Sequence, residues 1–290
     1  MSITATEFFS AEPNSLSFKV EDRFFTELKT SNNTFKRTAA DRFGQLDDHC
    51  IEYFDRAPIV LREVLDIGVS SGSTTLALSD RLRRAGRAAR ITGTDISMTA
   101  HLVQVAPSFR VLVDERGHPL QYELLGRAVR AWTRRADYLT GMMLLRTILR
   151  LSSRGRIRTS LDRAEQLRTV RLLSPRLIDR DDITIERNDI FERTPHFEGR
   201  FDFIRAANIL NRGYFEDKAL RQALANIAHY LSGPGAWLLV ARSVGKKTAG
   251  TLFNVSPDGR RLQLVSRIGT GSEIESLVLA TSVPSRQRAA

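Results

Sequence analysis

The stretch LDIGVSSGSTT, residues 65–75, decides the fold. Residues 60–67 are rich in valine and leucine, which predicts a buried parallel strand that ends at Asp66-Ile67-Gly68. Residues 73–85 then predict a helix, and residues 89–96 predict a second strand that ends at Asp95-Ile96. Together these segments form a βαβ unit of ordinary length.

The loop between the first strand and the helix narrows the class of ligand. Such a loop brings the backbone close to a ligand and offers unpaired N–H donors. A phosphate-binding P-loop is excluded because Gly72 is followed by Ser73-Thr74 without a lysine, and the dinucleotide fingerprint is excluded because residues 70 and 73 are serine. The acidic Asp66 favours a ligand with a positive charge, such as an amino group or a sulfonium.

Two later strand ends carry further polar side chains. Asp95 lies 27 residues after Gly68 and can accept hydrogen bonds from both ribose hydroxyls of a nucleoside. The strand pattern resumes at residue 183 and ends at Asn188-Asp189-Ile190, where a polar side chain can reach an adenine amino group. Acids at successive strand ends, without a phosphate-binding signal, indicate a cationic nucleoside ligand.

On these residues the sequence resembles the class I S-adenosylmethionine-dependent methyltransferases. The matching motifs are LDIGVSSGSTT, TDIS (94–97), RNDIF (187–191) and GPGAWLLVAR (233–242). The resemblance implies S-adenosyl-L-methionine as the cofactor. It implies cofactor contacts at Asp66, Gly68, Ser70, Gly72, Thr75, Asp95, Ile96, Asn188, Asp189, Ile190, Ala206 and Asn208.

Within that superfamily, FDFIRAANILNRGYF (201–215) looks most like the chemotaxis-receptor glutamate methyltransferases. Ala207 stands where those enzymes carry an arginine, so that arginine's contact with substrate is not carried over. The resemblance implies transfer of a methyl group to a protein carboxylate or a small molecule. A carboxylate needs no deprotonation by a general base, and the motif residues offer no obvious base, so we name no catalytic residue.

We expect an α/β fold, a Rossmann-like seven-stranded sheet with the last strand antiparallel, N-terminal helices and a helical insertion after strand 2. The expected divisions are a helical cap at 1–54, a methyltransferase domain at 55–282 interrupted by an Arg-rich helical insertion at 101–177, and a disordered tail at 283–290. Runs at 251–256, 261–269 and 274–280 look strand-like. In the insertion, apolar residues recur three and four positions apart, which predicts a helix. These residues are Tyr122, Leu125, Val129, Trp132, Ala136, Leu139 and Met143.

The charge is concentrated in the insertion. The chain has a formal net charge of +11, and residues 101–180 hold sixteen arginines, no lysine and seven acids. Such a patch suits an anionic membrane surface or a nucleic acid, and residues 141–158 would lie well in a lipid interface. Only six of the 44 basic residues are lysine, so an arginine bias in the genome's base composition is an equally simple explanation.

The remaining composition excludes several classes of protein. With 42% hydrophobic and 27% charged residues the chain is an ordinary globular protein, and no apolar run reaches the roughly 20 residues that span a bilayer. The single cysteine and five scattered histidines predict no metal site. We expect a methyltransferase that is cytoplasmic or peripheral at the membrane. The alternative is a non-catalytic nucleoside-binding or scaffold protein that docks through its Arg-rich insertion to a membrane or nucleic acid.

Overall fold

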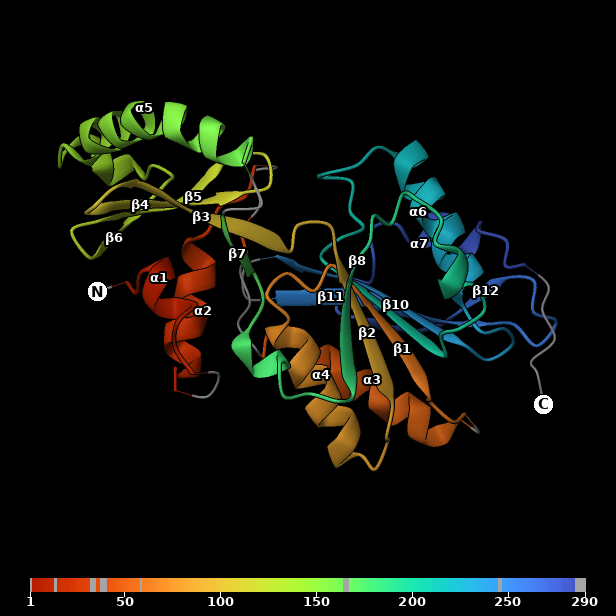
Figure 1. The fold of residues 1–290 in the computed structure, drawn as a ribbon. Coiled ribbons are helices and arrows are strands. Elements are labelled where there is room, and N and C mark those ends of the chain that lie inside the picture. Colours follow the sequence, from red (N-terminus) through yellow and green to blue (C-terminus); the bar gives the residue numbers. More distant parts are fainter. Residues whose placement is uncertain are drawn as a thin grey trace. The chain divides into compact units, whose positions relative to one another are not determined.

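The computed structural model describes residues 2–12, 15–31, 35–36, 41–57, 59–163, 167–244 and 247–284 (Figure 1). It divides into two compact units, which we describe separately. The sheet unit comprises Ala40–Val69, Ser73–Ile96 and Arg180–Ala290. The insertion unit comprises Met1–Ala39, Ser70–Gly72 and Ser97–Asp179.

A seven-stranded sheet in the order β12-β11-β10-β9-β1-β2-β8 organises the sheet unit. Its strands are β1 (Glu63–Ile67), β2 (Arg90–Asp95), β8 (Ile183–Arg187), β9 (Phe203–Ala207), β10 (Trp237–Val244), β11 (Lys247–Val255) and β12 (Leu262–Ile268). The five strands from β8 to β10 are parallel, and the chain leaves the central β1 first toward β8 and later toward β10. This is the doubly wound order of Rossmann-like folds, so the predicted α/β architecture is confirmed.

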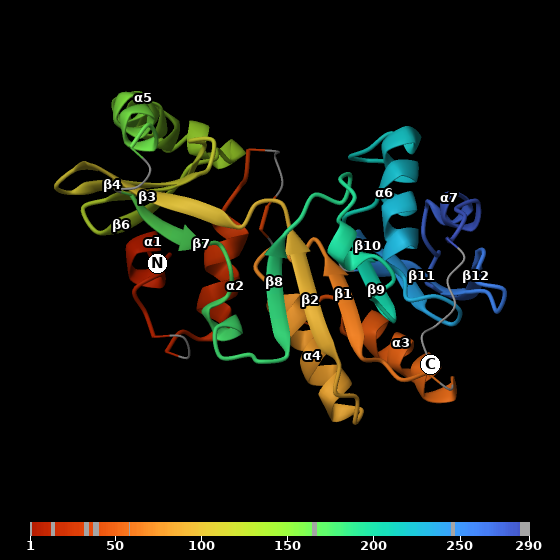
Figure 2. The ribbon, with the colours of Figure 1, turned by 45° about the vertical axis from the view of Figure 1, so that its right-hand side comes forward.

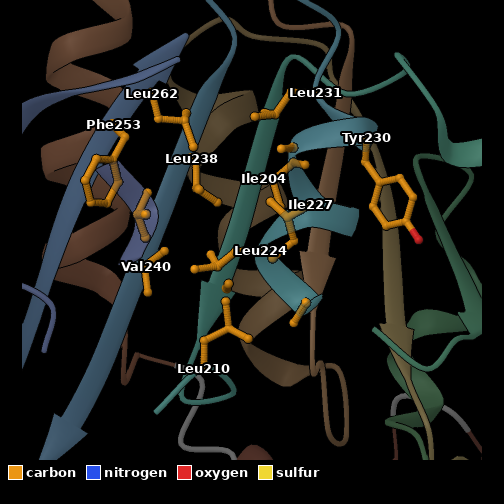
Figure 3. Packing of buried hydrophobic residues seen from close by; sticks show 14 of the residues in the cluster. Ile204, Leu210, Leu224, Ile227, Tyr230, Leu231, Leu238, Val240, Phe253 and Leu262 are labelled. Carbon is orange, nitrogen blue, oxygen red and sulfur yellow. The ribbon is translucent and has the colours of Figure 1, made fainter. Parts of the chain in front are cut away.

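The helices of this unit cover both faces of the sheet. The right-handed crossovers from β1 to β2 and from β9 to β10 run in opposite directions, which places α4 (Ser73–Arg84) and α6 (Asp217–Tyr230) on opposite faces (Figure 2). α3 (Gly44–Arg56) packs beside α4, and α7 (Glu275–Leu279) packs beside α6. Leu224, Ile227 and Leu231 lie against Ile204, Leu238 and Val240 of the sheet, which forms the main core (Figure 3).

Two expectations for the end of the chain were wrong. The reversed strand is β11, which is antiparallel to both neighbours, so the last strand β12 runs with the five parallel strands. Residues 274–280 contain the helix α7 and not a strand, because Ile274, Leu277 and Val278 are buried together at helical spacing. Of the predicted disordered tail, Val283 is buried, and residues 285–290 lie outside the described residues.

The insertion unit contains a second sheet, antiparallel and five-stranded, in the order β6-β5-β4-β3-β7. Its strands are β3 (Thr99–Ala106), β4 (Phe109–Asp114), β5 (Pro119–Leu124), β6 (Arg127–Arg130) and β7 (Arg168–Arg171). Leu125 and Gly126 both have positive φ and join β5 to β6, as a type I′ hairpin turn requires.

Helices cover both faces of this sheet as well. Val111 and Val113 of β4 pack with α5 (Met142–Leu161). Leu112, between them, faces the other side and packs with α1 (Ala5–Phe8) and α2 (Phe18–Glu27). The rings of Phe8 and Phe24 stack in that second core with centroids 3.9 Å apart.

The prediction of a mainly helical insertion was therefore wrong. Its position after the second strand is correct, but the supposed helix from Tyr122 to Met143 is a hairpin followed by loops and a short 3₁₀ turn, Arg135–Tyr138. Two positions of its apolar stripe, Leu125 and Leu139, are 73% and 90% exposed. The expected N-terminal cap is also divided, because α1 and α2 belong to the insertion unit whereas α3 belongs to the sheet unit.

Candidate functional site

The sheet register gathers the predicted cofactor residues at one edge. Ile67 pairs with Thr94 on one side and with Ala206 on the other. Asp95 pairs with Arg187 at the end of β8. The carboxyl ends of β8, β2, β1 and β9 therefore lie together, and the direction of winding reverses between β1 and β9. In doubly wound folds that reversal is where ligands bind.

The loop after β1 has the unusual backbone that the motif implies. Gly68, Ser70 and Gly72 have φ of 76°, 59° and 82°, and of these only Ser70 has a side chain that opposes such a conformation. The amides of Gly68 and Val69 both donate to the carbonyl oxygen of Thr94, at 2.7 and 3.0 Å. These bonds fix the start of the loop to the end of β2.

Lys36 is a residue that sequence reasoning missed. Its side chain is buried within the insertion unit, where Nζ donates to the carbonyl oxygens of Ser70 and Ser97. Those two residues follow the ends of the first and second strands along the chain. No motif could reveal Lys36, since the contacts join residues that are 34 and 61 positions apart.

Asp66 has partners that the sequence did not reveal. Its carboxylate is almost fully buried, at 2% exposure, and accepts hydrogen bonds from Arg205 Nε at 2.8 Å and Nη2 at 2.6 Å. Thr75, also buried, donates its hydroxyl to the same carboxylate at 2.7 Å. The carboxylate thus already accepts three hydrogen bonds within the core.

Arg205 joins Asp66 to a second buried acid. Its Nη1 lies 2.9 Å from both oxygens of Asp47 on α3, and Nη2 also donates to the carbonyl oxygen of Thr74. Burial raises the pKa of Asp47 to about 6, against the opposing effect of Arg205. Burial alone would lower the pKa of Arg205, but the two carboxylates raise it, so the guanidinium stays charged. We call Asp47, Asp66 and Arg205 the buried triad.

The second and third strand ends differ in accessibility. Asp95 is half-buried and Ile96 is 47% exposed. At the third strand end, Asn188 donates to the Thr194 hydroxyl, and Asp189 accepts the amide of Phe191. Ile190 is buried, and its carbonyl accepts from Asn226. The third strand end is therefore a hydrogen-bonded turn with a buried isoleucine, and the second strand end carries a half-buried carboxylate beside an exposed isoleucine.

Asn208, after β9, has an oriented and unsatisfied side chain. It adopts a φ of 63°, and its Oδ1 accepts the amide of Ser243 at 2.6 Å. Among the described residues neither Asn208 Nδ2 nor Ser243 Oγ has a hydrogen-bond partner, although both atoms are buried. A buried donor without a partner is costly, and a ligand oxygen would relieve that cost. Ala206 is buried inside β9 and offers only backbone.

The described residues contain no group of three or more side chains that could hold a metal ion. Cys50 is buried on α3, and burial raises the pKa of its thiol, so this cysteine is protonated and unreactive. The residues present fit a nucleoside better than a metal: a carboxylate, a neighbouring apolar side chain and an amide donor at one sheet edge.

No protein-family model matches the chain, and no curated protein matches it in sequence. Among solved structures it is similar to the CMeT domain of the citrinin polyketide synthase, with 15% identity, a TM-score of 0.36 and coverage of 70% of this chain and 37% of that one. It is similar to an O-methyltransferase family protein from Burkholderia thailandensis, with 14% identity, a TM-score of 0.30 and coverage of 70% and 39%.

A third similar structure is an amino pentose methyltransferase from Micromonospora echinaspora with SAM bound. It has 11% identity, a TM-score of 0.32 and coverage of 76% of this chain and 66% of that one. The chain spans less than half the length of the first two structures. Because the TM-scores are below 0.5, these similarities support no conclusion about function. The proposal below rests on the strand order and the geometry of the site.

Proposed function

We propose that this protein is an S-adenosylmethionine-dependent methyltransferase. The observation that carries the proposal is the carboxyl edge of β8, β2, β1 and β9, where the half-buried Asp95 and the unsatisfied amide of Asn208 lie on either side of the reversal point. A doubly wound sheet binds its ligand at this edge, and the loop from Gly68 to Gly72 lacks the phosphate-binding residues of nucleotide sites.

Three groups of residues would hold the cofactor. Asp95 would accept the ribose hydroxyls, the exposed Ile96 would contact the adenine, and the Asn188-Asp189-Ile190 turn would border it. The backbone of Gly68, Ser70 and Gly72 would lie beside the amino-acid part. We assign Asp66 and Thr75 to holding that backbone through the buried triad, since their polar atoms are already bonded.

The cofactor, when bound, supplies a methyl group on a positively charged sulfur. The work of the chain is to align the acceptor and exclude water, because an in-line displacement depends on orientation. Asn208 Nδ2 is oriented by its own Oδ1 bond to Ser243 and would hold an acceptor oxygen. An oxygen that accepts this bond fits a carboxylate, which agrees with the resemblance to the glutamate methyltransferases of chemotaxis receptors. A carboxylate also needs no base.

Calorimetric titration with S-adenosylhomocysteine tests the cofactor site. Asp95→Ala should weaken binding at least tenfold, because about 1.5 kcal/mol or more is lost for each hydrogen bond to a charged group. The matched control is Asp181→Ala, an acid at the opposite end of the same sheet whose side chain is 95% exposed. Asp181→Ala should leave the affinity within about twofold. Failure of the folded wild type to bind would refute the proposal.

Methyl transfer to small carboxylates tests the acceptor. Asn208→Asp keeps the oxygen that accepts from Ser243 but removes the Nδ2 donor, and aspartate tolerates the positive φ. We expect kcat to fall by about tenfold or more, since a directed hydrogen bond to the acceptor is lost and a like charge is introduced. Unchanged turnover in Asn208→Asp would exclude this role. Cofactor binding without transfer to any acceptor would favour the non-catalytic alternative.

A second candidate function is docking to an anionic membrane through α5. The helix contains no acid, and its outward face exposes Leu144, Ile148 and Leu151 beside exposed arginines such as Arg150 and Arg154. An apolar stripe flanked by arginine fits a lipid interface. Among the described helices, none is long and apolar enough to cross a membrane.

Cosedimentation with vesicles tests this docking. We expect binding to phosphatidylserine-containing vesicles but not to phosphatidylcholine alone, and loss of binding in Leu144→Ser/Leu151→Ser. The control Leu125→Ser changes an equally exposed leucine on a different element. Binding to RNA that survives the leucine changes, without vesicle binding, would instead assign the arginines to nucleic acid.

A further inference from the structure

A cavity of about 440 Å³ lies entirely within the insertion unit, and its lining is strongly basic. It is formed by residues from α1, β3, β4, the carboxyl end of α5 and the start of β7. Four arginines line it, Arg110, Arg156, Arg163 and Arg168, and none of the described lining residues is acidic. We propose that this cavity binds a small organic phosphate. This inference does not depend on methyl transfer.

The arginines of the cavity are oriented mainly by neutral hydrogen-bond acceptors, which do not cancel their positive charge. Arg156 donates to the carbonyl oxygen of Gln104, and Arg168 donates to the carbonyl of Phe9 and the hydroxyl of Ser10, both at 3.0 Å. These acceptors are neutral, so they orient the guanidinium groups without cancelling their charge. Within the described part of the chain, only Arg110 of the four has a carboxylate partner, Glu123 at 3.1 Å.

Arginines gathered around one cavity create a positive potential that attracts anions. Guanidinium groups bind phosphate through paired N–H donors, and such bonds are stronger than those between neutral groups. Thr6, Thr159 and Ser160 add hydroxyls to the lining, and Thr6 Oγ1 is buried with no partner among the described residues. The donors therefore outnumber the acceptors, as an oxyanion requires.

The volume of the cavity indicates an organic ligand. One water molecule takes about 30 Å³ in the liquid, so 440 Å³ far exceeds the space of one inorganic ion. It falls in the range of small-molecule sites. Leu102 and Leu167 give the lining an apolar part that would contact the carbon skeleton. The ligand is thus a phosphate ester, either soluble or the headgroup of a lipid.

The test is calorimetric titration of the full chain with glucose 6-phosphate, with glucose as the uncharged control. The double variant Arg156→Gln/Arg163→Gln removes two charges that have no carboxylate partner in the described structure, so it leaves no acid unpaired. We expect the affinity for glucose 6-phosphate to fall at least tenfold. Arg127→Gln, which changes an exposed arginine on β6 outside the cavity lining, should leave it unchanged.

A second arm separates the two sources of phosphate. Vesicles of phosphatidylcholine with and without phosphatidylinositol 4-phosphate are cosedimented with the wild type and with both variants. Binding that requires the phosphorylated lipid and is lost in Arg156→Gln/Arg163→Gln supports the cavity with a headgroup as its ligand. If neither glucose 6-phosphate nor these vesicles bind, or if Arg127→Gln weakens binding as much as the double variant, the proposal is overturned.

Discussion

In the sheet unit many arginines are paired with carboxylates, whereas along α5 of the insertion unit most have no such partner among the described residues. Arg205 lies between two buried acids, and surface arginines such as Arg81 contact Asp41 and Asp48. On α5 only the buried Arg146 has an ion-pair partner among the described residues, Asp137. Paired arginines support a fold, while unpaired ones are available to a ligand. The same residue type therefore has different uses in the two units.

The largest effect is expected at the buried triad. Arg205→Met would leave Asp47 and Asp66 without a counter-charge in the core, which should lower the free energy of unfolding by about 3 to 5 kcal/mol. Urea unfolding followed by tryptophan fluorescence measures this change. The control Arg212→Met breaks a half-exposed pair with Asp217 and should cost far less stability, because solvent screens such a pair. Equal losses in the two variants would remove the contrast between buried and surface pairs.

The loss of stability in Arg205→Met should depend on pH. A carboxyl group whose pKa is raised in the folded state stabilises the fold more as pH falls, because the folded form binds the proton more tightly. Burial already raises the pKa of Asp47 to about 6 with Arg205 present. The deficit of Arg205→Met should therefore shrink as pH is lowered from about 7 to about 5.

The next effect tests the core of the insertion unit. Leu120 on β5 is fully buried against α1 and α2, and Leu120→Ala should cost about 3 kcal/mol through the lost contacts and the cavity left behind. Leu125→Ala, five residues later, should cost almost nothing, since that side chain is 73% exposed. A helix through this segment would bury Leu125 instead. Thermal unfolding of the two variants decides between these arrangements.

A smaller change in stability is expected at the β5–β6 turn, and its sign distinguishes a hairpin from a helix. Gly126 has a φ of 70°, and no atom lies within 4 Å of the position of an added Cβ. Gly126→Ala should therefore destabilise by about 1 kcal/mol through backbone strain alone. In a helix the same change would stabilise by a similar amount. A raised melting temperature would contradict the hairpin.

The smallest effect concerns acid stability at Asp137. The ion pair with Arg146 and the hydrogen bond from the amide of Arg134 hold the pKa of Asp137 at about 2, below its usual value. A lowered pKa stabilises the fold at pH values above about 4, and this contribution is lost as pH falls through the folded-state value. The stability difference between wild type and Asp137→Asn should accordingly shrink from about pH 5 to about pH 3. A difference that stays constant over that range would contradict the assignment.

The parallel sheet could be predicted because its signals are local. The strands are short segments rich in apolar residues that end at turns, and Gly68 and Asp95 mark the ends of the first two strands. The insertion was misread because its apolar residues also fit a helical spacing. Two signals could have corrected it: valines at alternating positions, Val103, Val105, Val111 and Val113, and the Leu125-Gly126 turn.

By itself the sequence determined the βαβ unit, the doubly wound sheet and the strand ends that carry Asp95 and Asn208. Only the tertiary structure decided the partners of Asp66, since Arg205 is 139 residues away, and Arg205 lies 158 residues from Asp47. It also decided that residues from both ends of the insertion unit, Thr6 and Arg168 among them, line one basic cavity. Strands and turns follow from neighbouring residues, but charge pairing and cavities depend on side chains that meet only when distant segments pack.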